Sequence, residues 1–170
     1  MSYQNLIGKT APSFTLKNYD GKAFTFTPGA NGLPTALFFY PESGSKLCTK
    51  QACQFRQAIV EKDTFSPSKV HIVGISPDSV EKQKKFVADN KLTFPVLSDS
   101  DKSTFKTYQI GRGIMGLLPV SRVTFIVDKK GSCQALILTH SIRDALDATV
   151  NYGAHAKFVE KWLDQLETEN

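Results

Sequence analysis

Two cysteines that stand five residues apart, Cys48 and Cys53, are the side chains best able to carry covalent chemistry in this chain of 170 residues. The chain has three cysteines, the third being Cys133, and three thiols are too few for a scaffold of disulfides. The close spacing of two of them indicates reducing surroundings and transient oxidation. The sequence therefore predicts redox chemistry at this pair.

Cys48 has the setting of a nucleophile. It follows the apolar run Thr35–Tyr40 and a loop that contains proline and serine, and it opens a stretch in which apolar residues recur at helical spacing. A cysteine in the first turn of a helix faces unpaired backbone N–H groups and the positive end of the helix dipole, which both favour the thiolate. The alternative, a buried structural thiol, fits this position less well.

A thiolate in this position could reduce a peroxide. It would attack one oxygen while hydrogen-bond donors hold the other oxygen and stabilise the charge that develops on it. Ser45, three residues before Cys48, can place a hydroxyl beside the sulfur, and Pro41 can limit the access of water without competing as a donor. A nearby cation is the part that these residues do not supply.

The pattern PxxxSxxC, from Pro41 through Ser45 to Cys48, resembles the signature of the peroxiredoxins. Downstream, the segment Ser121–Phe125 resembles that family's arginine-bearing strand. The peroxiredoxin Q branch, also called bacterioferritin comigratory protein, matches best. The likeness covers nearly the whole chain, and the other segments that carry it are Gly8–Phe14, Gly74–Ser79 and Phe94–Asp99.

The resemblance implies a role for each candidate site residue. Cys48 would be the peroxidatic cysteine, with Pro41 and Ser45 shaping its pocket and Arg122 stabilising the thiolate and the peroxide. Hydrogen peroxide or an organic hydroperoxide would convert Cys48 to a sulfenic acid. Cys53, the resolving cysteine, would condense with it to an intramolecular disulfide, and thioredoxin would restore both thiols. No metal or organic cofactor is implied.

The residues alone leave alternatives open at two of these positions. Cys53 could be a packed core residue of an enzyme with one active cysteine, and Arg122 could pair with a surface carboxylate. Cys133 lies in an expected strand and is interpreted as a buried free thiol with no role. The three histidines show no metal-ligand spacing and are expected to be structural; they are His71, His140 and His155.

Helix geometry adds a condition to the proposed disulfide. Two helical residues five apart have α-carbons about 8 to 9 Å apart, which a disulfide cannot span. If Cys48 and Cys53 lie on one intact helix, part of that helix must unwind before they join, so oxidation should be coupled to local unfolding.

Two departures separate this chain from the branch it resembles. Lys46-Leu47 stands where the branch usually has Pro-Gly, and Gln51 stands where it often has glutamate. We hypothesise that Lys46 brings an extra positive charge near Cys48 and favours its thiolate.

Two other functions compete with peroxide reduction. A general disulfide oxidoreductase would carry CxxC in the first helical turn, whereas this chain has CxxxxC, and it would gain nothing from the proline, serine and arginine. A redox-sensing or chaperone-like binding module would use the same oxidation to change its surface. The residues leave this binding module open, and fast thioredoxin-coupled turnover would argue against it as the main role.

The elements that must position these residues alternate between strands and helices. A hairpin is expected from Ser13–Leu16 and Ala23–Phe26. Further strands are expected at Thr35–Tyr40, Val70–Ser76, Val96–Ser98, Val123–Val127 and Cys133–Leu138, and helices at Cys48–Asp63, Asp78–Asn90, Ser103–Tyr108 and Ala154–Leu166. This order predicts an α/β fold with a mixed central sheet flanked by helices in three layers and an N-terminal β-hairpin. The resemblance makes it thioredoxin-like, as a single domain over residues 1–170.

Composition and charge limit the classes of partner that are expected. The net charge of +5 comes from lysines spread along the chain, so nucleic-acid binding is not expected. No apolar stretch is long enough for a membrane span, and the first residues lack the features of a secretory signal or transit peptide. We expect the cytoplasm, with the nucleus equally open, and the branch implies a monomer.

Overall fold

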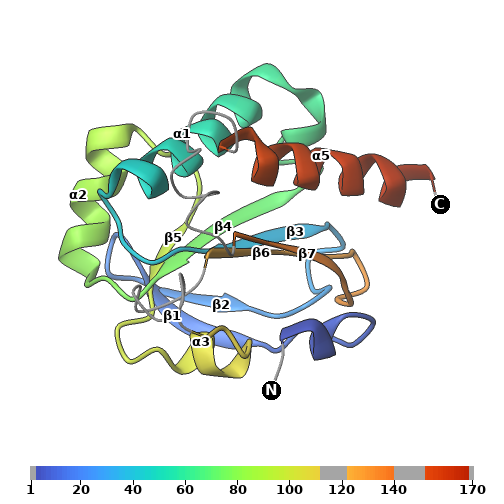
Figure 1. The fold of residues 1–170 in the computed structure, drawn as a ribbon, viewed down its shortest axis with the longest axis horizontal. Helices are drawn as coiled ribbons and strands as arrows, with labels where there is room; N and C mark the ends of the chain where they lie inside the picture. The colour runs from blue at the N-terminus through green and yellow to red at the C-terminus, as the bar shows by residue number, and fades with distance from the viewer. Residues whose placement is uncertain (1–2, 112–121, 140–151, 169–170) are drawn as a thin grey trace.

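The computed structural model describes residues 3–111, 122–139 and 152–168, in which one seven-stranded mixed sheet forms the centre (Figure 1). The strand order is β2-β1-β5-β4-β3-β6-β7. β3, β4 and β5 run parallel and every other neighbouring pair is antiparallel. The strands are β1 (Phe14–Asn18), β2 (Ala23–Phe26), β3 (Thr35–Phe39), β4 (His71–Ser76), β5 (Val96–Ser98), β6 (Arg122–Val127) and β7 (Cys133–Thr139).

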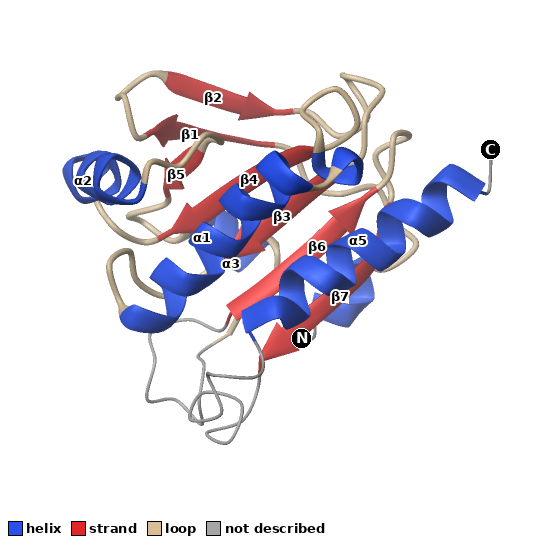
Figure 2. Cartoon of the chain, turned by 90° about the horizontal axis from the view of Figure 1, so that it is seen from above, coloured by secondary structure: helices blue, strands red, loops and turns tan. Residues whose placement is uncertain are grey.

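Helices cover both faces of the sheet and give three layers. One face carries α1 (Lys46–Glu61), α2 (Val80–Asn90) and α5 (Tyr152–Thr168), and the other carries α3 (Ser103–Thr107). Figure 2 shows α1 lying over β3 and β4, and α5 lying over β6 and β7. The expected α/β fold with its N-terminal hairpin is therefore confirmed.

Side chains along β3 point alternately to the two faces of the sheet, and the core is divided into two clusters. All five residues of this strand are buried, because it lies inside the sheet and is covered on both faces. Phe38 packs against α1 and α2 through Phe55 and the cluster that includes Phe86. Phe39 points the other way, into the cluster formed with Phe105 and the far face of the sheet.

The pairing of β3 with β4 depends on a glycine. Phe38 stands opposite Gly74 in the parallel register, and a β-carbon at Gly74 would lie 2.7 Å from the Phe38 ring. The absence of a side chain at Gly74 leaves room for the end of this ring, which stacks with Phe55 and with Tyr40.

The helix that carries Cys48 begins earlier than its apolar pattern indicated. The sequence predicted Cys48–Asp63, whereas α1 runs from Lys46 to Glu61. The helix starts after Ser45, whose backbone is extended and whose carbonyl accepts a hydrogen bond from Thr49, and it ends because Lys62 is again extended. Apolar spacing marks the buried face of a helix better than its ends.

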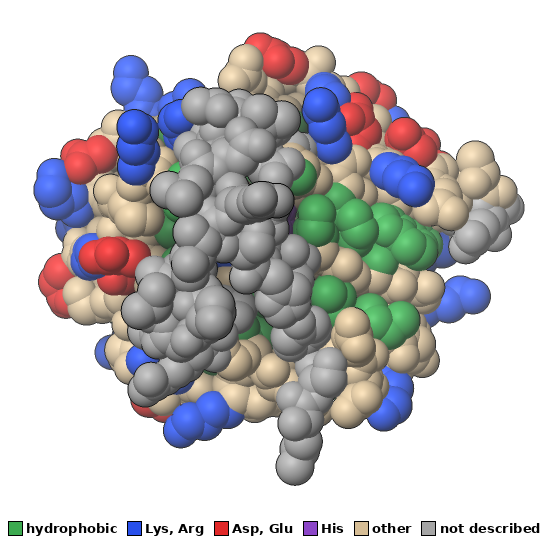
Figure 3. Space-filling model, viewed as in Figure 1, with side chains coloured by type: hydrophobic (Ala, Val, Ile, Leu, Met, Phe, Trp, Pro, Cys, Tyr) green, Lys and Arg blue, Asp and Glu red, His purple; other side chains and the backbone are tan. Residues whose placement is uncertain are grey.

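The described surface carries charges of both signs. On the face drawn in Figure 3, apolar side chains gather where Figure 1 draws α5 and β7, while lysine and arginine are spread around the margin and interleaved with acidic groups. In the part of the chain that the structure describes, no helix is long and apolar enough to cross a membrane.

Candidate active site

Cys48 is the third residue of α1, which follows the carboxyl end of β3. Its side chain is 1% exposed and belongs to the core cluster on the α1 face. The first turn of a helix leaves backbone N–H groups without intrahelical partners, so the sulfur lies at the positive end of the helix dipole. This is the position that the sequence predicted for it.

Arg122 provides the cation that the loop lacks. It is the first residue of β6. Because β6 pairs antiparallel with β3, this residue lies beside the carboxyl end of β3. Its Nη2 donates to the Cys48 sulfur at 3.1 Å, although 74 residues separate the two in the chain. A guanidinium at hydrogen-bond distance favours the charged form of a thiol.

Gln51 completes this contact. It lies three residues after Cys48, on the same side of α1, and it is 3% exposed. Its Oε1 accepts a short hydrogen bond from Arg122 Nη1, so the glutamine orients the guanidinium whose other nitrogen reaches the sulfur. Gln51 Nε2 is buried and has no hydrogen-bond partner among the described residues. The sequence singled out Gln51 only as a departure from the branch and gave it no role.

Ser45 and Pro41 lie in the loop that leads into α1. Ser45 is the residue before the helix, and its hydroxyl donates to the Glu42 carbonyl at 3.1 Å. The recorded hydrogen bond of this hydroxyl is therefore within the loop rather than with the sulfur. Pro41 is buried directly after Tyr40. The substrate-binding roles expected for both residues stay predictions.

Cys53 lies on the same continuous helix as Cys48. All three cysteines are free thiols, and Cys53 Sγ donates to Asn90 Oδ1 at 3.7 Å. Since α1 is unbroken from Lys46 to Glu61, the two α-carbons keep their helical separation and cannot be bridged in this conformation. The structure thus describes a reduced state, in which the unwinding predicted from the spacing has not occurred.

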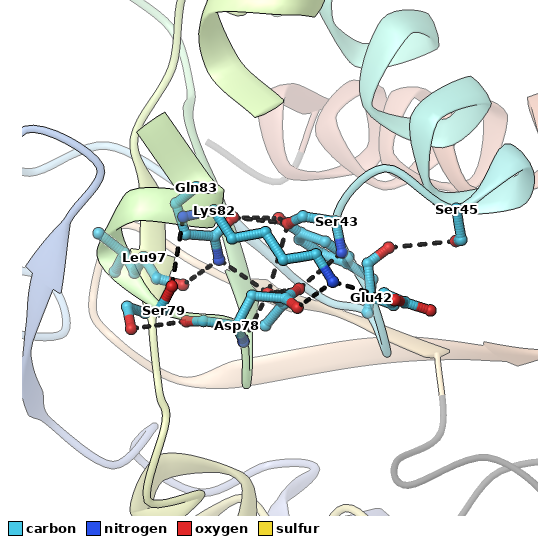
Figure 4. A network of polar contacts seen from close by, with 11 residues as sticks. Glu42, Ser43, Ser45, Asp78, Ser79, Lys82, Gln83 and Leu97 are labelled. Carbon is cyan, nitrogen blue, oxygen red and sulfur yellow. Dashed lines mark hydrogen bonds and ion pairs between the residues drawn. The ribbon is translucent and has the colours of Figure 1, made fainter. Parts of the chain in front are cut away.

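A buried polar network holds the loop before α1 in place (Figure 4). Ser43 is its centre: its backbone N–H donates to Asp78 Oδ2 at 2.6 Å, and its hydroxyl donates to Gln83 Oε1 at 2.6 Å. Gln83 Nε2 donates to Ser76 Oγ and to the Leu97 carbonyl. Side chains of β4, α2 and the segment between them therefore fix the turn that leads into α1 and Cys48.

Charge is balanced at the outer end of this network. Lys82 Nζ lies 2.7 Å from Asp78 and 3.0 Å from Glu42. Partial burial opposes ionisation of Asp78, but hydrogen bonds from Lys82, the Ser43 amide and Ser76 hold the pKa of its carboxyl below its usual value. Burial raises the pKa of the Tyr40 phenol, so Tyr40 stays protonated.

His155 lies on α5 behind the arginine. Its Nδ1 is 2.7 Å from Thr124 Oγ1 on β6, and its side chain is 3% exposed. Burial, assisted by the positive charge of Arg122, lowers the pKa of His155 to about 3. The imidazole is therefore neutral and does not add a second cation behind Arg122.

The remaining candidates lie away from this site. Cys133 is fully buried in the cluster on the opposite face, and burial raises the pKa of its thiol to about 11. His71 begins β4 at the other end of the sheet, while His140 and Ser121 lie outside the described residues. Within the described ranges, no three histidine, cysteine or acidic side chains are grouped as a metal site would require.

Comparisons with known proteins identify the family. Residues 7–135 match the model of the AhpC/TSA family. The chloroplastic peroxiredoxin Q of Populus jackii is 36% identical over 129 residues, which are 76% of this chain and 58% of that protein. For the chloroplastic peroxiredoxin Q of Sedum lineare the identity is 37% over 75% of this chain and 66% of that protein. The matched region thus spans less than two thirds of these plant relatives.

Solved structures extend the comparison to the fold. The crystal structure of peroxidoxin BcpB from Mycobacterium tuberculosis superposes with a TM-score of 0.75, at 30% identity, over 94% of this chain and 96% of that chain. Peroxiredoxin Q from Xanthomonas campestris superposes with a TM-score of 0.67 over 86% of this chain and 91% of that chain. At 23% identity, this second likeness concerns the fold alone.

Proposed function

This chain belongs to the AhpC/TSA family and is of the peroxiredoxin Q type, and we propose on that basis that it is a thiol peroxidase with Cys48 as its nucleophile. The observation that carries the proposal is the contact between Arg122 Nη2 and the Cys48 sulfur at 3.1 Å, made at the start of a helix. A guanidinium and a helix N-terminus acting on one sulfur favour the thiolate that attack on a peroxide requires.

The first step oxidises Cys48. The thiolate attacks one oxygen of a hydroperoxide, the O–O bond breaks, and the other oxygen leaves and takes up a proton to become water or an alcohol. Cys48 becomes a sulfenic acid and the peroxide is reduced by two electrons. Arg122 stabilises the charge on the departing oxygen, and Gln51 holds the guanidinium in place during this step.

The second step forms a disulfide. The Cys53 thiol condenses with the sulfenic acid of Cys48, so that an S–S bond forms and water leaves. Because both residues lie on the intact α1, the first turns of this helix unwind to bring the sulfurs together. A dithiol reductant, for which we propose thioredoxin, then reduces the disulfide by exchange and restores the starting state.

The proposed substrates are hydrogen peroxide and small organic hydroperoxides, and the proposed role is antioxidant defence and redox homeostasis. The chain is proposed to act as a monomer in the cytoplasm, or equally in the nucleus, without nucleic acid or membrane as a partner. Cys48 is 1% exposed, and such close burial suits a small hydroperoxide better than a bulky one.

Stopped-flow measurement of peroxide consumption tests the proposal, with thioredoxin and its reductase supplied. Full turnover is expected for the wild type, none for Cys48→Ser, and one stoichiometric oxidation without efficient recycling for Cys53→Ser. Cys133→Ser is the matched control, since Cys133 lies in the opposite cluster, and it should retain turnover. Turnover that survives in Cys48→Ser would overturn the assignment of the nucleophile.

A further inference from the structure

Asn90, the last residue of α2, is tied to the middle of α1 at two points. Its side-chain Oδ1 accepts the hydrogen bond from Cys53 Sγ at 3.7 Å. Its backbone carbonyl accepts a hydrogen bond from Arg56 Nη1 at 2.6 Å. Cys53 and Arg56 are three residues apart and so lie on the same side of α1. One residue at the end of α2 thus holds two side chains, about one turn apart, on the helix that must unwind.

The Asn90 side chain is itself held in position. Its Nδ2 donates to the Phe86 carbonyl at 2.9 Å, which directs Oδ1 toward α1. The residue that follows, Lys91, has a left-handed backbone with φ of 50° and ends the helix there. Asn90, Cys53 and Arg56 are all partly buried. Water therefore competes less for their hydrogen bonds than it would at an exposed site.

This contact is seen in a conformation that cannot form the disulfide. With α1 intact, Cys48 and Cys53 are separated by more than a full turn of helix. A hydrogen bond that is present before disulfide formation and absent from its transition state stabilises only the starting state. It therefore slows disulfide formation. The bond also engages the Cys53 sulfur as a donor to Asn90, away from the Cys48 sulfur.

We propose that Asn90 is a positioning residue that restrains Cys53 and thereby sets the lifetime of the Cys48 sulfenic acid. The inference rests on the proposed function, in which Cys53 resolves that acid by forming the S–S bond and releasing water. While Asn90 holds the thiol, a second peroxide molecule can oxidise Cys48 further to the sulfinic acid and is itself reduced to water or an alcohol. Asn90 thus sets the partition between the disulfide and overoxidation.

Two substitutions of Asn90 should change this partition in opposite directions. Asn90→Ala removes the acceptor, and resolution should become about two- to fivefold faster, the size expected for one weak hydrogen bond. Asn90→Asp keeps an oxygen acceptor but loses the Nδ2 donor to the Phe86 carbonyl. Because it also adds a negative charge that disfavours the Cys53 thiolate, resolution should become slower. A merely structural role would make both variants change in the same direction.

The measurement is the ratio of disulfide to Cys48 sulfinic acid, determined by mass spectrometry over a range of hydrogen peroxide concentrations. The concentration that overoxidises half of the protein should rise about two- to fivefold for Asn90→Ala and fall for Asn90→Asp. Gln57→Ala is the matched control, because Gln57 is exposed on α1 and bonds only Glu61 in the recorded contacts; its ratio should equal that of the wild type.

The outcomes separate this inference from the proposed function. If peroxide leaves Cys48 unoxidised in every variant, the peroxidase assignment fails. If Cys48 is oxidised and the disulfide forms, but both Asn90 variants share the wild-type ratio or shift together, the restraint by Asn90 is wrong while the peroxidase assignment stands.

Discussion

A single guanidinium connects the two side chains of α1 that face the site. Arg122 reaches the Cys48 sulfur with one nitrogen and the Gln51 carboxamide with the other. Because a carboxamide is neutral, the positive charge of Arg122 is not cancelled by its orienting partner. In the proposed reaction, the full charge is available to the sulfur and to the oxygen that leaves.

Replacing Arg122 tests this arrangement at the scale of the residue. Arg122→Met keeps a flexible apolar side chain, though a shorter one, and removes the charged guanidinium. The second-order rate of Cys48 oxidation by hydrogen peroxide should fall about 10²- to 10³-fold, as for the loss of one charge-stabilising donor. Stopped-flow kinetics under single-turnover conditions measure it. Arg56→Met, which removes a guanidinium bound to Asn90 instead, is the control and should leave this rate within about threefold of the wild type.

His155 predicts a dependence of stability on pH. The pKa of His155 is lowered to about 3 in the folded protein, against about 6.5 in an unfolded chain. Between these values the unfolded state binds more protons, so stability is fully present above pH 6.5 and is lost as the pH falls toward 3, by about 1.4 kcal/mol per pH unit.

Urea unfolding of the reduced protein at several pH values between 5 and 7 checks this dependence. His155→Gln retains a group that can bond Thr124 but does not titrate, and its free energy of unfolding should vary less over this range than that of the wild type. An equal slope in both proteins would show that other groups cause the acid sensitivity.

At the scale of elements, the turn before α1 depends on buried side chains of α2. Gln83 is fully buried on the inner side of that helix and bonds Ser43, Ser76 and the Leu97 carbonyl. Gln83→Leu would leave several of these groups without partners, at a cost of about 2–4 kcal/mol in the free energy of unfolding. Cys48 oxidation should also slow, since the turn that carries it is less well fixed.

Chemical denaturation and peroxide kinetics measured on the same preparation test both effects. Gln57→Leu is the comparison on an exposed site, where the change in stability should stay within about 0.5 kcal/mol. Unchanged stability of Gln83→Leu would mean that the network does not anchor the turn.

Much of the fold could be predicted from local pattern, and the contacts between distant elements could not. The buried strand Val96–Ser98 was located to the residue because its apolar run is bounded by proline and aspartate. Gln83 was not predicted to be buried, since a polar residue on a helix gives no indication of what lies opposite it. The proximity of Arg122 to Cys48 came only from the family resemblance, because spacing along the chain does not reveal contacts across 74 residues.

At the scale of the whole molecule, the sheet separates a core that touches the site from one that does not. Phe38 and Phe39 are equally buried and adjacent, but Phe38 lies in the cluster with Cys48 and Phe39 in the other. Leucine at either position should cost about 1–2 kcal/mol of stability. Only Phe38→Leu should also slow Cys48 oxidation, which thermal unfolding and peroxide kinetics on both variants can establish. Equal slowing in both variants would contradict the separation.

The deep burial of Cys133 in the second cluster has a practical consequence. A thiol that is sealed from solvent and protonated at neutral pH reacts with alkylating reagents only when the sheet opens. Its rate of alkylation therefore reports the opening of the fold, independently of the oxidation state of the other two sulfurs. Alkylation of Cys133 therefore measures how often the folded protein opens, and it can be followed in a cell extract.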